Sequence, residues 1–480
     1  MALLKRADSD QRNLAQLFGF TDLVPLSVSS VGPLFSVAAT GGVMAAQAGW
    51  WTLPAILILA LPFIVSSFVF RLMNRHFPHS GASYHWSAKI VGKKVARYQA
   101  WILILAYFMS IPPIAIPAGS YTLALVFPNS HPSPFVQTVA TLFWIIFAAV
   151  PLLMGSKPTA TITKIFFVIE VLSFGLLVIA GIAEFHSLSV PIHFGSIPIG
   201  GMLVVAVVGA TILDGWEIDS YAAEESKRPR VDPGKAGIVG AILAFCFYIF
   251  LYPLMFAETP LSKLANSSDP LAVWGMRLFP HSPAVILIPV IASAAGGLWL
   301  TTFILTRVLF AMGRENIILS SMAKLSKKKV PYVATILILI LTMLVCSAQL
   351  LFHSLGAFFG LVLSTAGFFL LAEFFLDSVV ATIFLITGHK KHPDSEINLH
   401  KHRFLTAGSI FSSVTMGSLL ITFFIFGPRA IGAGIDQTLT VMLVMGFGFA
   451  YLVGKKAKTL FVFHGNEVKE IKEVRAADVV

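Results

Sequence analysis

Twelve apolar stretches, each long enough to cross a lipid bilayer as a helix, recur along this 480-residue chain. A transmembrane helix needs about 20 predominantly apolar residues. The stretches lie at 21–46, 51–71, 98–123, 135–154, 160–182, 199–222, 236–257, 283–312, 331–351, 356–388, 404–427 and 438–454. Charged residues make up 12% of the chain, whereas soluble domains carry about 25%. The sequence therefore predicts an all-α integral membrane protein with about 12 transmembrane helices.

The lysines and arginines occupy every second gap between the stretches. Of 34 such residues, 31 fall on one side of the predicted membrane, and only Lys263, Arg277 and Arg429 fall on the other. Because cytoplasmic loops carry excess positive charge, both termini should be cytoplasmic and the number of crossings even. The net charge of +11 thus reflects orientation and not a nucleic-acid partner. We expect a cytoplasmic segment at 1–20, a single 12-helix domain at 21–454, and a cytoplasmic tail at 455–480.

The first stretch is interrupted near the middle of the membrane, where Gly32 precedes Pro33 among several serines. Proline removes a backbone donor and disfavours helical geometry at the residue before it. Non-helical backbone at membrane depth is tolerated only where protein or a watery cavity covers it. We therefore expect a discontinuous first helix that marks a binding site. The alternative is a proline kink without a ligand.

The sixth stretch carries acidic residues inside the membrane. Three of them surround Gly215: Asp214, Glu217 and Asp219. Ionisable groups inside a bilayer are costly and usually functional. The alternative is a helix that ends early, with the acids at the cytoplasmic surface. We expect that alternative for Glu224 and Glu225, which precede Lys227.

The two interruptions lie in helices one and six. These helices correspond if the chain contains two inverted five-helix repeats, helices 1–5 and 6–10, followed by two C-terminal helices. Transporters of this kind bind their substrate at the midplane between two discontinuous helices. The positions of the breaks therefore predict a transporter, although the two halves show no clear sequence identity.

Other acids inside the stretches are candidates for proton coupling. Glu170 has only apolar neighbours for two residues on either side, so it could carry a proton or serve as a structural carboxyl bonded to a neighbouring helix. Glu373 and Asp377 share one helix face. A structural role is favoured slightly for this pair, because no broken helix is expected beside it. His79 and His85 belong to a predicted loop or re-entrant piece, and we expect no metal site and no cofactor.

Three segments resemble the amino acid, polyamine and organocation (APC) superfamily of permeases. The longest reads DGWEIDSYAAEESKRPRVDPGK and is similar to the sixth-helix signature of that superfamily. The others read HFPHSGASYHW and TRVLFAMGRENIIL, the latter followed by VPYVATIL. Their order and spacing also fit. The resemblance implies a LeuT-type fold and an amino acid bound between the broken helices one and six.

The resemblance also implies a substrate site. Sixth-helix carbonyls that receive an ammonium group fall near Thr211, Ile212 and Asp214, and first-helix amides that receive a carboxylate fall near Ser30, Val31, Gly32 and Leu34. Amides at a helix amino terminus favour an anion, and carbonyls at a carboxyl terminus favour a cation. The full set of expected substrate-binding residues is Ser30, Val31, Gly32, Pro33, Leu34, Thr211, Ile212, Asp214, Gly215, Trp216 and Glu217. The proton-coupling candidates are Glu170, Asp219, Glu373 and Asp377.

The expected function is secondary active transport of amino acids by alternating access, as proton-coupled symport or exchange. The expected partners are a small amino acid or amine, protons and the lipid bilayer of the plasma membrane. A polyamine or other organic-cation carrier is the main alternative, motivated by the acids around Gly215. A channel and a membrane-embedded enzyme are less favoured, since the sequence contains a pair of broken helices and no catalytic motif.

Overall fold

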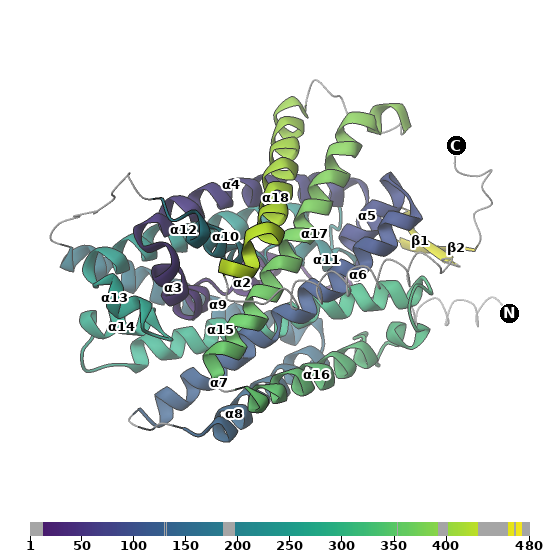
Figure 1. The fold of residues 1–480 in the computed structure, drawn as a ribbon. Helices are drawn as coiled ribbons and strands as arrows, with labels where there is room; N and C mark the ends of the chain where they lie inside the picture. The colour runs from purple at the N-terminus through teal and green to yellow at the C-terminus, as the bar shows by residue number, and fades with distance from the viewer. Residues whose placement is uncertain are drawn as a thin grey trace.

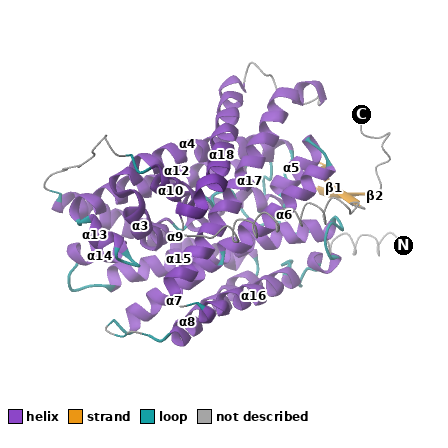
Figure 2. Ribbon diagram, viewed as in Figure 1, coloured by secondary structure: helices purple, strands orange, loops and turns teal. Residues whose placement is uncertain are grey.

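The computed structural model describes residues 13–128, 130, 132–185, 197–352, 354–391, 402–430, 459–464 and 467–472. Nearly all of these residues are helical, and the long helices pack against one another in one bundle (Figure 1). Within the described ranges the only sheet is an antiparallel pair, β1 (Thr459–His464) with β2 (Glu467–Lys472), shown in orange in Figure 2. The prediction of an all-α membrane protein is confirmed.

The first five predicted spans become separate helices, with the first one divided in two. In chain order the elements are α2 (Phe20–Val31), α3 (Pro33–Ala48), the 3-10 turn η1 (Gly49–Trp51), α4 (Thr52–His76), α5 (Ala82–Ile90), α6 (Lys93–Ser110), α7 (Pro112–Val126), α8 (Pro134–Met154) and α9 (Ser156–Glu184). The third predicted span is divided between α6 and α7, where Pro112 and Pro113 begin the second helix.

The sixth predicted span is also divided. The remaining elements are α10 (Ile199–Leu213), α11 (Ile218–Tyr221), η2 (Ala223–Glu225), α12 (Asp232–Glu258), α13 (Leu261–Ala265), α14 (Pro270–Leu278), α15 (Ala284–Arg314), η3 (Ser320–Ala323), α16 (Tyr332–Ser347), η4 (Ala348–Leu351), α17 (Leu355–Lys391) and α18 (Arg403–Ala430). The short helices α13 and α14 lie at the opposite end of the bundle from α5 (Figure 1).

Nine candidate membrane spans occur in the described residues by length and hydropathy. The first of them, Phe20–His76, contains two of the predicted spans, and the shorter apolar helix α10 represents the sixth. Eleven of the twelve predicted spans are thereby matched. The twelfth, 438–454, lies outside the described residues.

The outer surface of the bundle is apolar, as contact with lipid requires. On α9, Ile165, Leu172 and Ile179 follow one another at seven-residue intervals on one face and are 55%, 68% and 70% exposed. Glu170 projects from the other side of the same helix and is completely buried. Water would penalise such an apolar face, whereas hydrocarbon does not. The helix therefore presents its apolar side to the bilayer and its carboxyl group to the protein.

The basic gaps between helices meet at one end of the bundle. Glu225 accepts backbone hydrogen bonds from Leu17 and Phe18, and its side chain pairs with Arg307 of α15 at 2.7 Å. Glu224 pairs with Arg314 at 2.5 Å. The expectation that Glu224 and Glu225 lie at the surface is therefore wrong. Two arginines of α15 reach the acids, and the ion pairs allow both carboxylates to be buried.

Candidate functional site

The first break lies where the sequence places it. Gly32 ends α2 and precedes α3 with φ 56° and ψ 58°, a left-handed conformation that glycine adopts without strain. Pro33 has no N–H, so the carbonyl of Ser29 loses its helical donor. The carbonyl of Ser30 also lacks its donor, because the N–H of Leu34 donates elsewhere. The break therefore exposes backbone acceptors at the end of α2.

The amides that begin α3 are occupied by side chains from two other helices. Leu34 N–H donates to Oε1 of Glu170 at 3.3 Å, and Phe35 N–H donates to Oγ of Ser293 at 3.1 Å. Ser293 in turn donates to the same Glu170 oxygen at 2.5 Å. A carboxylate at a helix amino terminus is favourable. Glu170 thus connects α9 and α15 to the first break, and its Oε2 has no hydrogen-bond partner among the described residues.

The second break follows Leu213, the last residue of α10. Asp214 is extended, and Gly215 has φ 112°. The N–H of Gly215 donates to both carboxylate oxygens of Glu217, at 3.1 and 2.9 Å, so it is not available to the carbonyl of Thr211. The carbonyl of Ile212 accepts from the hydroxyl of Tyr248 at 2.5 Å. At the second break, as at the first, backbone carbonyl groups thus lack their helical donors or accept hydrogen bonds from side chains instead.

The two breaks touch each other. A Cβ atom on Gly215 would lie 2.7 Å from the carbonyl carbon of Ser30 and 2.8 Å from the nitrogen of Val31. Ser27 of α2 donates to the carbonyl of Trp216 at 2.8 Å. The discontinuous helices one and six are thereby confirmed, and their unwound residues form one contiguous region.

A cavity of about 40 Å³ lies beside the paired breaks. Five of the predicted substrate-binding residues line it: Ser30, Val31, Thr211, Ile212 and Asp214. The other six do not: Gly32, Pro33, Leu34, Gly215, Trp216 and Glu217. The volume exceeds that needed by one water molecule.

The cavity has a polar side and an apolar side. Ser30 and Asp214 line its polar side, and the Oγ of Ser30 and Oδ1 of Asp214 are buried without a hydrogen-bond partner among the described residues. Phe359, Leu363 and Ile114 contribute to the apolar side. Such a lining suits a ligand with a polar end and an aliphatic side chain, for which the cavity would have to widen.

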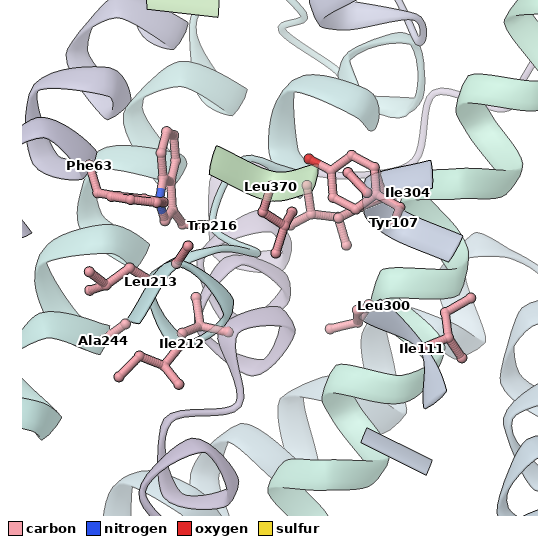
Figure 3. Close-up of a cluster of buried hydrophobic side chains, with 14 of the residues drawn as sticks. Phe63, Tyr107, Ile111, Ile212, Leu213, Trp216, Ala244, Leu300, Ile304 and Leu370 are labelled. Carbon is pink, nitrogen blue, oxygen red and sulfur yellow. The ribbon is translucent and has the colours of Figure 1, made fainter. Parts of the chain in front are cut away.

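Trp216 and Glu217 belong to other surroundings. The indole ring of Trp216 packs against Phe70 and Phe374 at centroid distances of 5.2 and 5.9 Å. Figure 3 shows this ring beside Phe63 in the apolar cluster that flanks the broken helix. Glu217 instead accepts a hydrogen bond from Tyr107 at 2.9 Å. The contacts of these two side chains stabilise the backbone of the break, and neither side chain borders the cavity.

The remaining acids lie close to the broken sixth helix. The hydroxyl groups of Tyr107 and Tyr221 lie 3.2 and 2.9 Å from Oε1 of Glu373 of α17. The expectation that no broken helix lies beside Glu373 and Asp377 is therefore wrong. Tyr221 belongs to α11, which the sequence pattern does not place next to α17. Asp219 is buried in α11, and neither of its carboxylate oxygens has a partner in the described part of the chain.

The histidines after α4 are buried against the end of α15. The rings of His79 and His85 stack with centroids 3.9 Å apart, and Glu315 lies 3.5 and 3.6 Å from them. These three groups are close enough together to ligate a metal ion. However, Arg314 lies 3.1 Å from Nε2 of His79, and parallel stacked rings cannot direct their nitrogens toward one tetrahedral ion. We therefore assign no metal site to these three groups.

Acid should destabilise the protein through His79. Burial holds the pKa of His79 well below its usual value, and the positive charges of His85 and Arg314 lower that pKa further. The unfolded chain therefore binds a proton that the folded protein does not bind, so stability falls as pH drops below the ordinary histidine pKa of about 6.5. We expect the melting temperature to fall between about pH 7.5 and about pH 5.5, and to fall less in His79→Gln.

The exposed His281 provides the control for this measurement. The variant His281→Gln should keep the wild-type dependence of melting temperature on pH. Equal pH dependence in wild type and His79→Gln would contradict the assignment.

Paired helix breaks at mid-membrane, a cavity beside them and an apolar outer surface define a membrane transporter of the broken-helix class. Residues 18–450 match the sequence model of the amino acid permease family. The chain belongs to that family, and it is an amino acid transporter and not an enzyme. The resemblance to the APC superfamily is confirmed.

Individual relatives are distant but cover much of the chain. The branched-chain amino acid permease BcaP of Bacillus subtilis is 25% identical over 68% of this chain and 74% of its own length. The methylthioribose transporter of the same organism is 26% identical over 81% of this chain and 84% of its own length. The L-methionine/branched-chain amino acid exporter YjeH of Escherichia coli is 25% identical over 46% and 52%. The alternative of a polyamine carrier is not favoured by these comparisons.

Proposed function

We propose that the protein carries an aliphatic amino acid across the plasma membrane together with a proton, by alternating access around the paired breaks. The cavity between the breaks is the observation that supports this proposal. Its aliphatic and aromatic lining would accommodate the substrate side chain, and its unpartnered Ser30 and Asp214 oxygens would meet the polar end. The names of two relatives, BcaP and YjeH, point to the same substrate class.

The ammonium group would bind at the carboxyl end of α10. There Asp214 offers a free carboxylate oxygen, and the carbonyl of Thr211 has lost its helical donor to Glu217. The carboxylate would bind beside Ser30. The amides expected to receive it are already engaged, since Gly32 N–H donates to Val28 and Leu34 N–H donates to Glu170. The proposed carboxylate subsite therefore differs from the one that the resemblance implies, in which these amides bind the carboxylate.

Uptake into proteoliposomes tests the proposal. Labelled leucine, isoleucine, valine, lysine and putrescine are offered with and without an inward proton gradient. We expect the branched-chain amino acids to accumulate when the gradient is present and to exchange when it is absent. Preferential uptake of lysine or putrescine would overturn the substrate assignment, and exchange without gradient-driven accumulation would overturn the coupling.

Glu170 is a proposed protonation site at the first break. Protonation would remove the anion that caps α3, which weakens the connection between α3, α9 and α15. We expect Glu170→Gln to lower gradient-driven uptake about tenfold or more. The control is Glu184→Gln, at the exposed end of the same helix. If Glu170→Gln left gradient-driven uptake unchanged, Glu170 would be only a structural carboxyl.

The orientation and domain organisation complete the proposal. The gaps rich in lysine and arginine meet at one end of the bundle, where the N–H of Phe18 donates to the carbonyl of Glu225 and the N–H of Lys227 donates to the carbonyl of Phe18. This end would face the cytoplasm. The segment 1–20 and the tail 455–480 would then both be cytoplasmic, on either side of a transporter domain at 21–454.

A further inference from the structure

A row of buried hydroxyl and carboxyl groups leads away from the second break. The hydroxyl of Tyr107 lies 2.9 Å from Oε1 of Glu217 and 3.2 Å from Oε1 of Glu373. The hydroxyl of Tyr221 lies 2.9 Å from the same oxygen of Glu373. Two tyrosines, from α6 and α11, thus connect the break to α17.

The row continues to a second carboxyl group of α17. Ser83 Oγ lies 3.1 Å from the hydroxyl of Tyr221 and 2.8 Å from Oδ2 of Asp377. Asp377 also accepts from Nε2 of Gln99 at 2.5 Å. Ser83 belongs to α5, in the gap that carries basic residues. We call these groups the carboxyl-hydroxyl row: Glu217, Tyr107, Glu373, Tyr221, Ser83 and Asp377.

The row begins beside the cavity. Asp214 lines the cavity, and its carboxyl group is close enough to Glu217, three residues on, for the two acids to act on each other electrostatically. Its Oδ1 is buried and has no partner among the described residues, and the residue is 7% exposed. An unpartnered carboxylate oxygen on a residue that lines the cavity can receive a proton once a ligand or water reaches it. Asp214 is therefore the residue that links the cavity to the row.

The number of available protons restricts the ionisation of the row. Five contacts join its six groups, but its three hydroxyl groups supply only three protons. Each hydroxyl can donate to one neighbour and must accept from the other. The remaining two protons must come from the carboxyl groups. Three carboxyls therefore share two protons, and one of the three is an anion.

The anion can occupy three positions without breaking any contact. If Glu217 is ionised, every hydrogen bond points toward Glu217 from Asp377. If Asp377 is ionised, every bond points the other way. If Glu373 is ionised, the bonds from both sides converge on it. When the negative charge moves from Asp377 to Glu217, each proton of the row moves to the next group in the direction of Asp377. The net result is the transfer of one proton from Glu217 to Asp377.

The two ends stabilise the anion better than the middle does. The two oxygens of Glu217 share the single N–H of Gly215, and Asp377 accepts a hydrogen bond from Gln99. Oε2 of Glu373 has no partner in the described residues. None of the ion pairs between described residues joins a lysine, arginine or histidine to the three carboxyls. The other acids near Glu217 are Asp214 and Asp219.

We propose that the carboxyl-hydroxyl row conducts the coupled proton from the cavity toward the end of the bundle where the basic gaps meet. A proton from the cavity passes through Asp214 to ionised Glu217, and protonated Asp377, which is 4% exposed, releases one proton to water at the far end. The bonds of the row then shift back, which transfers a proton from Glu217 to Asp377 and regenerates the Glu217 anion. One proton enters and one leaves in each cycle. This inference rests on the proposed proton-coupled transport.

The experiment compares two activities of the same proteoliposomes. Exchange of labelled leucine at equal pH on both sides needs no net proton movement, whereas accumulation driven by an imposed proton gradient does. Proton entry is followed with a pH-sensitive dye trapped in the vesicles. The variants are Tyr107→Phe, Tyr221→Phe and Glu373→Gln, with Ser83→Ala as a milder fourth. The matched control is Tyr121→Phe, which removes a buried hydroxyl that donates to Ser268 outside the row.

We expect the row variants to exchange leucine within about threefold of wild type and to lose accumulation and proton entry about tenfold or more, whereas Tyr121→Phe changes neither. Wild-type accumulation in Tyr107→Phe and Glu373→Gln would overturn the proposal. Loss of both activities in all four variants at the wild-type melting temperature would also overturn it, because the row would then serve binding. Absence of exchange in the wild type would instead refute the proposed function itself.

Discussion

Replacing Gly215 with alanine is expected to lower amino acid transport about a hundredfold, because the added methyl group would push the two helix breaks apart. The new Cβ would lie within 2.8 Å of the Ser30 carbonyl group and of the Val31 nitrogen, all of which are backbone atoms. A backbone clash cannot be relieved by turning a side chain. The φ of 112° adds strain for any residue with a Cβ. Leucine exchange in proteoliposomes measures the effect.

Gly200, near the start of α10, offers a control in the same predicted span. A Cβ at Gly200 meets no atom within 4 Å. Gly200→Ala should therefore exchange leucine as wild type does, and its melting temperature should not fall. Wild-type exchange in Gly215→Ala would show that the contact between the breaks is not needed for transport.

Replacing Arg314 with glutamine is expected to lower the free energy of unfolding by about 3–5 kcal/mol. Arg314 donates to both oxygens of Glu224, at 2.7 and 2.5 Å, and the two side chains are 2% and 1% exposed. Without the guanidinium, the Glu224 carboxylate would be buried with no cation paired to it. The melting temperature of the purified protein in detergent is the measurement.

Two further variants distinguish this effect from a general loss of charge. Arg228 forms an ion pair with Asp232 but is 66% exposed, so Arg228→Gln should cost about 1 kcal/mol or less. The double variant Arg314→Met with Glu224→Leu should recover much of the lost stability, because no buried charge then remains unpaired. Equal melting temperatures for Arg314→Gln and Arg228→Gln would contradict the assignment.

The bundle and both helix breaks could be predicted from the sequence because they depend on local features. Apolar length determines a membrane helix, and the chemistry of Gly32, Pro33 and Gly215 determines where the backbone unwinds. Spacing on one helix also identified Glu373 and Asp377 as neighbours on a face. These features need no knowledge of which helices pack together.

Several partners within the site could not be predicted because they come from distant segments. Ser293 lies 123 residues from Glu170, and nothing around it distinguishes it from a serine bonded to its own helix. Tyr107 lies 110 residues from Glu217, in an otherwise apolar span. The burial of Glu224 was missed for the same reason, since its partner Arg314 follows 90 residues later. Only the folded arrangement brings these groups into contact.

The central claim is that the substrate binds where the two breaks meet, and a structure determined in saturating leucine tests it most directly. We predict density for one leucine in the cavity, with its polar end beside Ser30 and Asp214 and its side chain against Phe359 and Leu363. Leucine bound outside this cavity, or a cavity that remains empty while the same preparation exchanges leucine, would contradict the account.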